Sequence, residues 1–206
     1  GHAYIYWSLG LAEKGKGEAL IDVANIPNGE LIGPPGTLVR SKQVPAKSFD
    51  DNVGYATTKG LQIHYLRTDH RDPDDRRLEE EGLIARVPDA YEAQLSSTFQ
   101  NSTFWNVALS GVDAPYSEKL IFENIDVRGV DAVGSYGFRL DHFANDDSLA
   151  LQNSSAQGFH FGATPTPAGE ARVQDVDLAA NTEPLRVQAI DLNDDEDGDE
   201  DQDDGD

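Results

Sequence analysis

The chain has 206 residues, of which 38 are acidic and 16 basic, giving a formal charge of −22 at neutral pH. This length predicts one domain, or one domain with appendages, and 38% hydrophobic residues suffice for a folded core. The acidic balance argues against direct binding of nucleic acid or of an anionic membrane, because both require basic surfaces.

The first residues have the pattern of strands and turns. Residues 3–11 are rich in Tyr, Ile and Trp, and residues 19–23 alternate apolar with polar side chains. The glycine-rich stretch 13–17 between them predicts a β-hairpin. A further strand is expected at 61–66. No apolar run reaches the length of a membrane span, and the first residues lack a signal-peptide pattern.

Residues 72–82 give the clearest helix signal. Asp72 is suited to the N-cap, Pro73 to the first helical position and Gly82 to the end of the helix. A second short helix is expected at 88–96. Because the first of these segments is mostly polar, we expect a helical insertion at about 72–97 on the surface of the domain.

From residue 98 onward the strand pattern returns, with turn signals between strands. Short strands are expected at 99, 104–109, 120–127, 135–143, 158–162, 173–178 and 185–192. The long helices that alternate with strands in βαβ units are missing, and no internal repeat is evident. We therefore expect residues 1–192 to form an all-β domain, an antiparallel β-sandwich or jelly roll with one or two short surface helices.

The last segment, 193–206, is an acidic tail. Ten acidic residues and no basic one lie between Asp194 and Asp206, so the remaining 28 acidic and 16 basic residues leave the body at about −12. The spacing of Asn193, Asp195 and Asp197 partly imitates a calcium-binding loop, but flanking helices and a final glutamate are missing. We expect a disordered tail that condenses cations loosely.

Potential metal ligands are densest near residues 64–72. His64, His70 and Asp72 supply two imidazoles and a carboxylate, the ligand types of a transition-metal site. A strand that leaves the sheet into a charged loop accounts for the same residues, so we assign no metal and no cofactor. We also assign no catalytic residue, because a nucleophile motif is absent and 38 acids always contain some close pair. The chain has no cysteine, which excludes disulfides and thiolate sites.

Adjacent aromatic residues and two polar triplets bear on the surface. Aromatic side chains gather at Tyr4–Trp7 and at 104–105. Because neighbouring residues on a strand point to opposite faces, we expect both faces of these strands to be covered, and a partner subunit could cover one of them. Residues 101–103 and 153–155 are glycosylation-type triplets and slightly favour an exterior position.

A composition with many aspartates, few lysines and no cysteine is typical of proteins that work at high salt. There the Debye length falls to about 3 Å and repulsion between carboxylates is screened. With its many short strands, the chain resembles, at the level of class, the small jelly-roll capsid proteins of haloarchaeal viruses. This resemblance implies a structural subunit located in the virion, whose partners are its own copies or other virion proteins.

Two alternatives to the virion subunit remain open. One is a ligand- or carbohydrate-binding β-sandwich on a cell or virion surface. The other is an enzyme that acts on sugars. For both, the location could also be extracellular or the cytoplasm of a halophile. We expect a structural or binding role rather than catalysis, because no catalytic constellation stands out.

Overall fold

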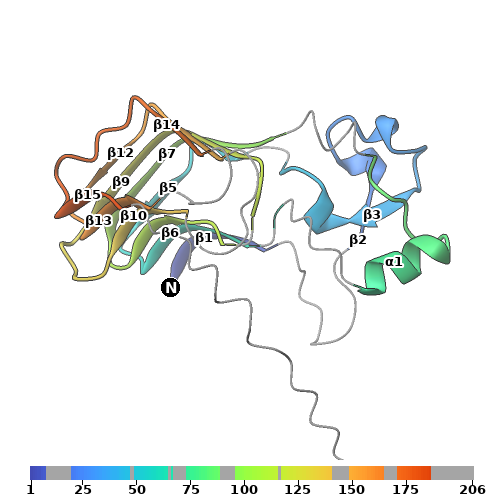
Figure 1. Ribbon diagram of the computed structural model, residues 1–206, viewed down its shortest axis with the longest axis horizontal. Coiled ribbons are helices and arrows are strands. Elements are labelled where there is room, and N and C mark those ends of the chain that lie inside the picture. The colour runs from blue at the N-terminus through green and yellow to red at the C-terminus, as the bar shows by residue number, and fades with distance from the viewer. Residues whose placement is uncertain are drawn as a thin grey trace, which may run out of the picture.

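The structure is a computed structural model that describes residues 1–7, 20–46, 49–64, 66, 73–88, 96–115, 117–140, 149–164 and 171–186. Most of its strands belong to two large sheets (Figure 1). The six-stranded sheet has the spatial order β1-β6-β8-β10-β13-β15, and all its neighbouring pairs are parallel. Its strands are β1 (His2–Trp7), β6 (Lys59–His64), β8 (Ser110–Asp113), β10 (Tyr136–Arg139), β13 (Phe161–Thr164) and β15 (Glu183–Leu185).

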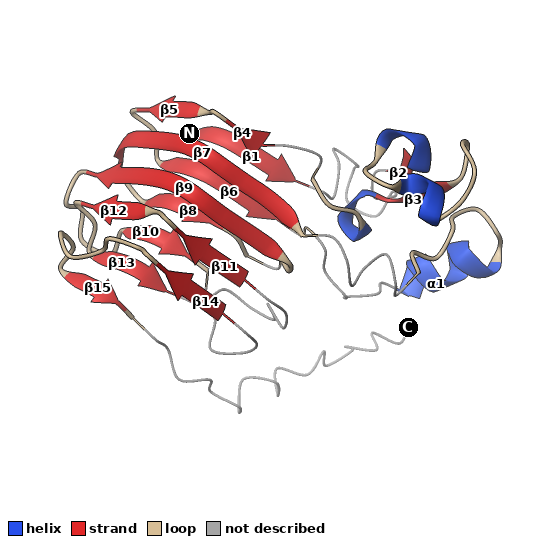
Figure 2. Cartoon of the chain, turned by 90° about the horizontal axis from the view of Figure 1, so that it is seen from above, coloured by secondary structure: helices blue, strands red, loops and turns tan. Residues whose placement is uncertain are grey.

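The seven-stranded sheet is parallel too, with the order β14-β11-β9-β7-β4; in addition, β12 pairs with β9 and β5 with β7. Its strands are β4 (Phe49–Asp50), β5 (Val53–Tyr55), β7 (Ser97–Val107), β9 (Leu120–Gly129), β11 (Leu149–Gln152), β12 (Ser155–Gln157) and β14 (Ala171–Gln174). Figure 2 shows the strands stacked side by side along one axis.

The chain passes alternately from one sheet to the other, and each return adds a strand beside the previous one. Thr98 pairs with Ile121, and Ile121 pairs with Ala150, so one coil places equivalent residues directly next to each other. This arrangement is a parallel β-solenoid, a repeat architecture in which each coil packs on its neighbours. Successive parallel strands are reached through the opposite sheet, so the connections need no long helix.

The predicted antiparallel β-sandwich or jelly roll is therefore wrong. Short strands separated by turns, with alternating apolar side chains, are equally compatible with a solenoid, because alternation reports which face is buried and not the strand direction. The predicted hairpin within residues 3–23 is also wrong. β1 pairs with β6, while β2 (Leu20–Asp22) pairs antiparallel with β3 (Leu38–Arg40).

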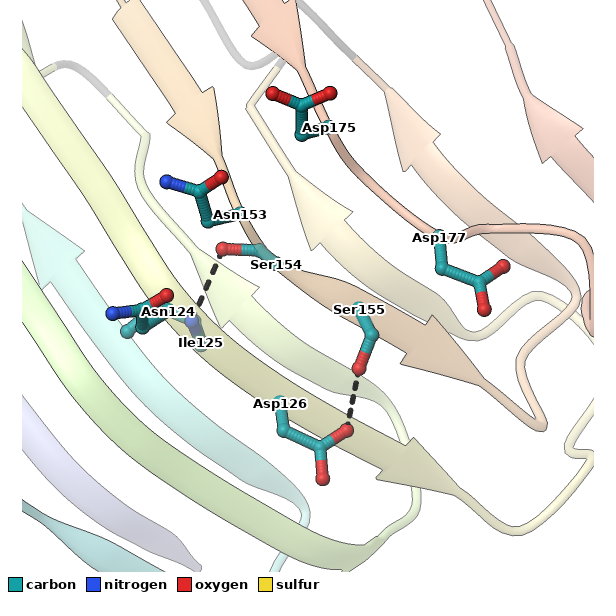
Figure 3. Close-up of a pocket in the computed structure, with 8 residues that line it drawn as sticks. All are labelled: Asn124, Ile125, Asp126, Asn153, Ser154, Ser155, Asp175 and Asp177. Carbon is teal, nitrogen blue, oxygen red and sulfur yellow. Dashed lines mark hydrogen bonds between the residues drawn. The ribbon is translucent and has the colours of Figure 1, made fainter.

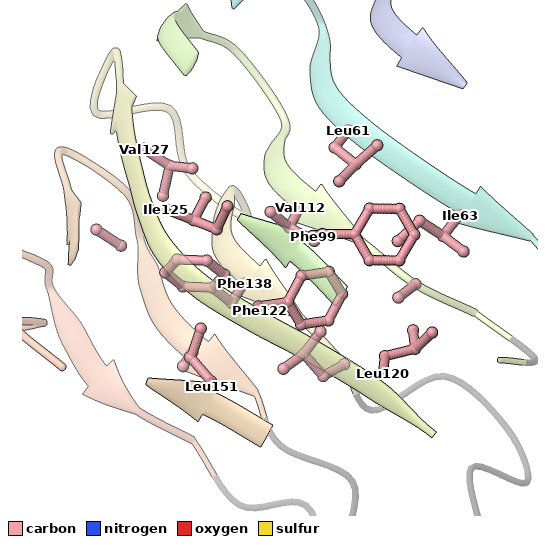
Figure 4. Close-up of a cluster of buried hydrophobic side chains, with 14 of the residues drawn as sticks. Leu61, Ile63, Phe99, Val112, Leu120, Phe122, Ile125, Val127, Phe138 and Leu151 are labelled. Atoms are coloured by element: carbon pink, nitrogen blue, oxygen red, sulfur yellow. The ribbon is translucent and has the colours of Figure 1, made fainter. Parts of the chain in front are cut away.

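The core lies between the two sheets and is built from equivalent residues of successive coils (Figure 4). Phe49, Phe99 and Phe122 follow one another in register, with ring centroids 5.4 and 5.6 Å apart. Opposite them, Val112 and Phe138 of the six-stranded sheet are fully buried. Such rows let each coil bury its apolar face against the next one.

A column of residues with left-handed backbone bends every coil of the seven-stranded sheet. Asp51, Asn101, Asn124, Asn153 and Asp175 have φ values between 49° and 55° and occupy equivalent register positions. Asn and Asp tolerate this conformation best among residues with a Cβ atom. The Asn124 amide nitrogen donates to the Asn101 side-chain oxygen (3.0 Å), and Asn101 donates to Asp50 (2.8 Å).

Each of the two glycosylation-type triplets, 101–103 and 153–155, begins with an asparagine of this left-handed column. In both, the asparagine is exposed and the serine that follows is buried. Ser102 Oγ accepts from the backbone nitrogen of Asn52 and donates to Gln100 O; Ser154 Oγ accepts from Ile125 N and donates to Gln152 O. The triplets therefore mark an internal repeat, which the sequence analysis did not find.

Two insertions into the coils form a small lobe that stands beside the solenoid (Figure 1). The first contains β2, β3 and three short 3₁₀ helices: η1 (Val23–Asn25), η2 (Gly29–Leu31) and η3 (Ser41–Gln43). The second contains α1 (Pro73–Glu80), where the sequence predicts a helix. Ala85 N donates to Leu38 O and so joins the two insertions. Among the described residues, no helix has the length and apolar character needed to cross a membrane.

Some predictions fall largely outside the described residues. They are the second helix at 88–96, of which 89–95 are not described, and the tail 193–206. The boundary between a domain at 1–192 and this tail stays a prediction.

Candidate functional site

The outer face of the seven-stranded sheet presents two rows of side chains in register across β5, β7, β9 and β12. The residues between these rows, including Phe104 and Val127, are fully buried, so alternation turns the rows outward. The first row is Val53, Thr103, Asp126 and Ser155, with Asp177 bridged to Ser155. The second row is Tyr55, Trp105, Arg128 and Gln157.

Tyr55 and Trp105 are exposed aromatic residues, with 66% and 46% of their surface accessible. Their ring centroids lie 6.5 Å apart at an interplanar angle of 88°, an edge-to-face arrangement. Each ring therefore steadies the other while parts of both remain open to solvent. Exposing two large aromatic side chains gives up burial that would stabilise the fold, so their position suggests a ligand.

Asp126 and Arg128 place a fixed charge pair next to the aromatic rings. Arg128 is in register with Trp105. Asp126 Oδ2 accepts from Arg128 Nε (3.0 Å) and contacts Nη2 (2.9 Å), and Asp126 Oδ1 accepts from Ser155 Oγ (2.6 Å). The side chains of Asp126 and Arg128 are 29% and 55% exposed, so both can still bind a ligand. The pair is pre-oriented and adds no net charge.

A groove of about 390 Å³ continues this surface over the neighbouring coils (Figure 3). All of its lining residues except Ile125 are of polar type: Asn124, Ile125, Asp126, Asn153, Ser154, Ser155, Asp175 and Asp177. Figure 3 shows the carboxylates of Asp126, Asp175 and Asp177 arranged around the serine and asparagine side chains. Carboxylates accept hydrogen bonds, whereas amides and hydroxyls also donate them, so the groove suits a ligand rich in hydroxyl groups.

The left-handed column explains why these polar groups gather in one place. Asn124, Asn153 and Asp175 belong to that column, and the outward residues Asp126, Ser155 and Asp177 each follow two positions later in the chain. Because every coil bends at the same position, the solenoid repeats an outward position at each coil, and on the coils of this groove that position is polar. The groove is thus a direct consequence of the repeat.

The metal site weighed in the sequence analysis is not assembled in the described residues. His64 ends β6 on the other sheet and is half-buried, whereas His70 and Asp72 lie outside the described residues. Across the described ranges, no group of three or more histidines and carboxylates is arranged to hold a metal ion.

Sequence reasoning missed Tyr55, Asp126 and Asp177 as site residues. Trp105 was noted only as a neighbour of Phe104, and the structure separates the two: Phe104 is buried and Trp105 points outward. The triplets at 101–103 and 153–155 could have indicated these residues. They mark equivalent bends on two coils, so the residues that follow each triplet occupy equivalent positions on the sheet.

Comparison of the chain with models of protein families, with curated proteins and with solved structures finds no match. Function is therefore inferred from the chemistry of the surface.

Proposed function

We propose that the protein binds a polysaccharide on the outer face of the seven-stranded sheet. The observation that carries this proposal is the exposed Tyr55–Trp105 pair beside a polar groove. A pyranose ring presents C–H groups on its faces, and these pack against the negative face of an aromatic ring. Its hydroxyl groups need acceptors and donors, which Asp126, Ser155 and Asp177 offer.

The repeat of the solenoid suits a polymer. Neighbouring strands lie about 4.8 Å apart, close to the length of one pyranose unit. A glycan that runs across β7, β9 and β12 meets Trp105 first, then Arg128 with Asp126, and then Ser155. Each coil would therefore contact about one sugar.

The hydrogen bonds of Asp126 favour binding over cleavage. Asp126 already accepts from Arg128 and Ser155, whereas cleavage of a glycosidic bond needs a carboxylic acid that gives its proton to the leaving oxygen.

Binding of neutral polysaccharides tests the proposal. Affinity electrophoresis and calorimetry at molar potassium chloride would screen neutral glycans, and Tyr55→Ala and Trp105→Ala should each weaken binding by about tenfold because a stacking platform is lost. Val133→Ala is the matched control, since Val133 is 91% exposed but lies in the turn after β9. The proposal fails if no neutral glycan binds, or if the Trp105 variant binds as well as the control.

Fluorescence gives a second readout of the same contact. The chain has two tryptophans, so Trp7→Phe leaves Trp105 as the sole indole. A stacked sugar should shift and strengthen its emission, with a midpoint that equals the calorimetric dissociation constant. An unchanged emission at saturation would place the ligand elsewhere.

A subunit of a virus particle stays an untested proposal. This proposal rested in part on an antiparallel jelly roll, which the parallel sheets of the solenoid contradict. Assembly contacts would be sought at β1 and β4, the strands at one end of each described sheet, because edge strands can pair with another chain. Mass measurements at high and low salt would detect such assemblies.

A further inference from the structure

Two asparagines of the left-handed column, Asn101 and Asn153, each begin a triplet of the form Asn-x-Ser/Thr. This is the acceptor pattern of N-linked glycosylation, in which the asparagine amide takes the sugar and a hydroxyl follows two residues later. In both triplets the asparagine is exposed, and the third residue, Thr103 or Ser155, lies in the first outward row of the sheet. Sequence pattern and exposure therefore suit both asparagines.

Hydrogen bonds distinguish the two amides. Asn101 Nδ2 donates to Asp50 Oδ1 (2.8 Å), and Asn101 Oδ1 accepts from Asn124 Nδ2 (3.0 Å). Both ends of the Asn101 carboxamide are thus held in a ladder that joins neighbouring coils. A sugar on Nδ2 would replace one of its two hydrogens and crowd the Asp50 carboxylate, so modification of Asn101 would disturb this ladder.

The side chain of Asn153 is outside the ladder. Within the part of the chain that the structure describes, its carboxamide has no hydrogen-bond partner, although the residue occupies the same position of the coil as Asn124. Asn153 is exposed and lines the polar groove (Figure 3). Its Nδ2 can therefore take a sugar without breaking a hydrogen bond of the fold.

We propose that Asn153 is N-glycosylated in the folded protein and that Asn101 is not. The donor is an oligosaccharide carried on a polyprenyl diphosphate, and the catalyst is an oligosaccharyltransferase. The bond between the sugar C1 and the phosphate oxygen breaks, and a bond between C1 and Asn153 Nδ2 forms. Nδ2 releases one proton, and the polyprenyl diphosphate leaves with the electron pair of the broken bond. The hydroxyl of Ser155 completes the acceptor triplet.

The surroundings of Asn153 suit the first sugars of such a glycan. The groove of about 390 Å³ lies beside its amide, and the exposed carboxylates of Asp175 and Asp177 line the same groove. Asp175 accepts from Gln174 Nε2 (3.2 Å) and Asp177 accepts from Ala179 N (3.2 Å). Each carboxylate keeps lone pairs that can accept from sugar hydroxyls, so the groove would hold an attached glycan against the sheet.

This modification goes beyond polysaccharide binding and does not depend on it. An attached glycan would share the groove near Ser155 with a bound polysaccharide, so polysaccharide binding is measured on the unmodified protein. The aromatic pair, Tyr55 and Trp105, lies on β5 and β7 and not on the coil of Asn153. Glycosylation is detected by mass and polysaccharide binding by affinity, so the failure of one proposal is distinguishable from the failure of the other.

The first test measures the intact mass of the protein from the cells that make it, followed by peptide mapping. One glycan should be found, on the peptide that contains Asn153. Asn153→Gln and Ser155→Ala should each remove the whole mass increment, whereas Ser155→Thr should keep it because the hydroxyl is retained. Asn101→Gln is the matched control: the same change in the other triplet should leave the increment in place. Thermal unfolding of each variant checks that it is folded.

The second test asks whether the fold selects between the two asparagines. Purified, unmodified protein is incubated with an oligosaccharyltransferase and a polyprenyl diphosphate oligosaccharide, and the folded chain should be modified at Asn153 alone. Short unfolded peptides that contain either triplet should both be modified. Absence of a glycan at Asn153, or a glycan at Asn101 of the folded protein, would overturn the proposal. An unmodified Asn101 peptide would also overturn it, because the hydrogen-bond ladder would then not be what protects that asparagine.

Discussion

The solenoid and the inserted lobe are stabilised in different ways. The solenoid has one core that continues from coil to coil and includes five fully buried phenylalanines. The core of the lobe is a cluster of five buried residues, Val23, Ile26, Val39, Val44 and Val87, from two separate insertions. A small core excludes less apolar surface from water, so the lobe should open before the solenoid does.

Among the described residues, few contacts that could couple their unfolding join the two regions. Ala46, at the end of the first insertion, packs against the main core and its backbone nitrogen donates to Ser97 Oγ (2.9 Å). In the solenoid, by contrast, each strand is hydrogen-bonded to neighbours over several residues. Stability in such a repeat is a sum of coil and interface contributions, so loss of one coil weakens its neighbours as well.

The largest expected effect is that of Phe122→Ala. Phe122 is fully buried on β9, between Phe99 and Leu151 in register, and its loss leaves a cavity at the middle of the solenoid. The free energy of unfolding should fall by about 3–5 kcal/mol. Chemical denaturation followed by far-UV circular dichroism measures it. A loss below about 1 kcal/mol would mean that the aromatic column does not hold the coils together.

The second prediction concerns the lobe. Val39→Ala removes two methyl groups from its small core and should cost about 2 kcal/mol, but only for opening of the lobe. Hydrogen exchange should accelerate at Val23 and Ala85, whose amides bond to Thr37 and Leu38, and stay unchanged at Thr103, whose amide bonds to Asn52. Faster exchange at Thr103 would show that the lobe and the solenoid unfold together.

The sequence predicted the position of many strands but not their partners. Residues 120–123 and 125–127 of β9 alternate buried and less buried side chains, as the pattern indicates, with the left-handed Asn124 between them. Alternation fixes the face of each residue, whereas direction and pairing depend on where the chain goes after each turn. The repeat was hidden because insertions separate β1 from β4 and β6 from β7, so equivalent residues do not recur at one period.

The candidate surface could be predicted only in part. Trp105 was recognisable as an aromatic beside a buried one, and the Asn-Ser triplets marked equivalent bends. Asp126 and Asp177 could not be singled out among 38 acidic residues, because their proximity arises from pairing of β9 with β12 and the Ser155–Asp177 bridge. Such contacts between distant segments leave no local pattern.

The third prediction tests the left-handed column of the solenoid. Asn124 has a φ of 53° and donates to Asn101, so Asn124→Ala adds backbone strain and removes a hydrogen bond. The expected loss of unfolding free energy is about 1–2 kcal/mol. Asn124→Gly keeps the backbone conformation accessible and should lose less. Equal losses in both variants would mean that the side-chain ladder, and not the backbone, accounts for the effect.

The smallest expected effect separates the two regions by pH. Hydrogen bonds from the side chains of Gln100 and Asn101 lower the pKa of Asp50, and burial raises it by a smaller amount. Hydrogen bonds from the backbone amides of Ala24 and Gly36 lower the pKa of Asp22. A lowered pKa in the folded state means that the ionised carboxylate stabilises the fold. This contribution is complete above the usual value of 3.8 and is lost as the pH falls through the lowered one.

Asp50→Asn should therefore make the unfolding free energy of the solenoid less sensitive to acid, and Asp22→Asn should do the same for exchange of lobe amides alone. Asp50 is exposed and Asp22 partly exposed, so solvent screens both carboxylates and the effects are small, best measured as changes of slope with pH. If Asp22→Asn alters the pH slope of the solenoid amides, the two regions share one cooperative unit. If Asp50→Asn shifts stability equally at every pH, its hydrogen bonds do not depend on the negative charge.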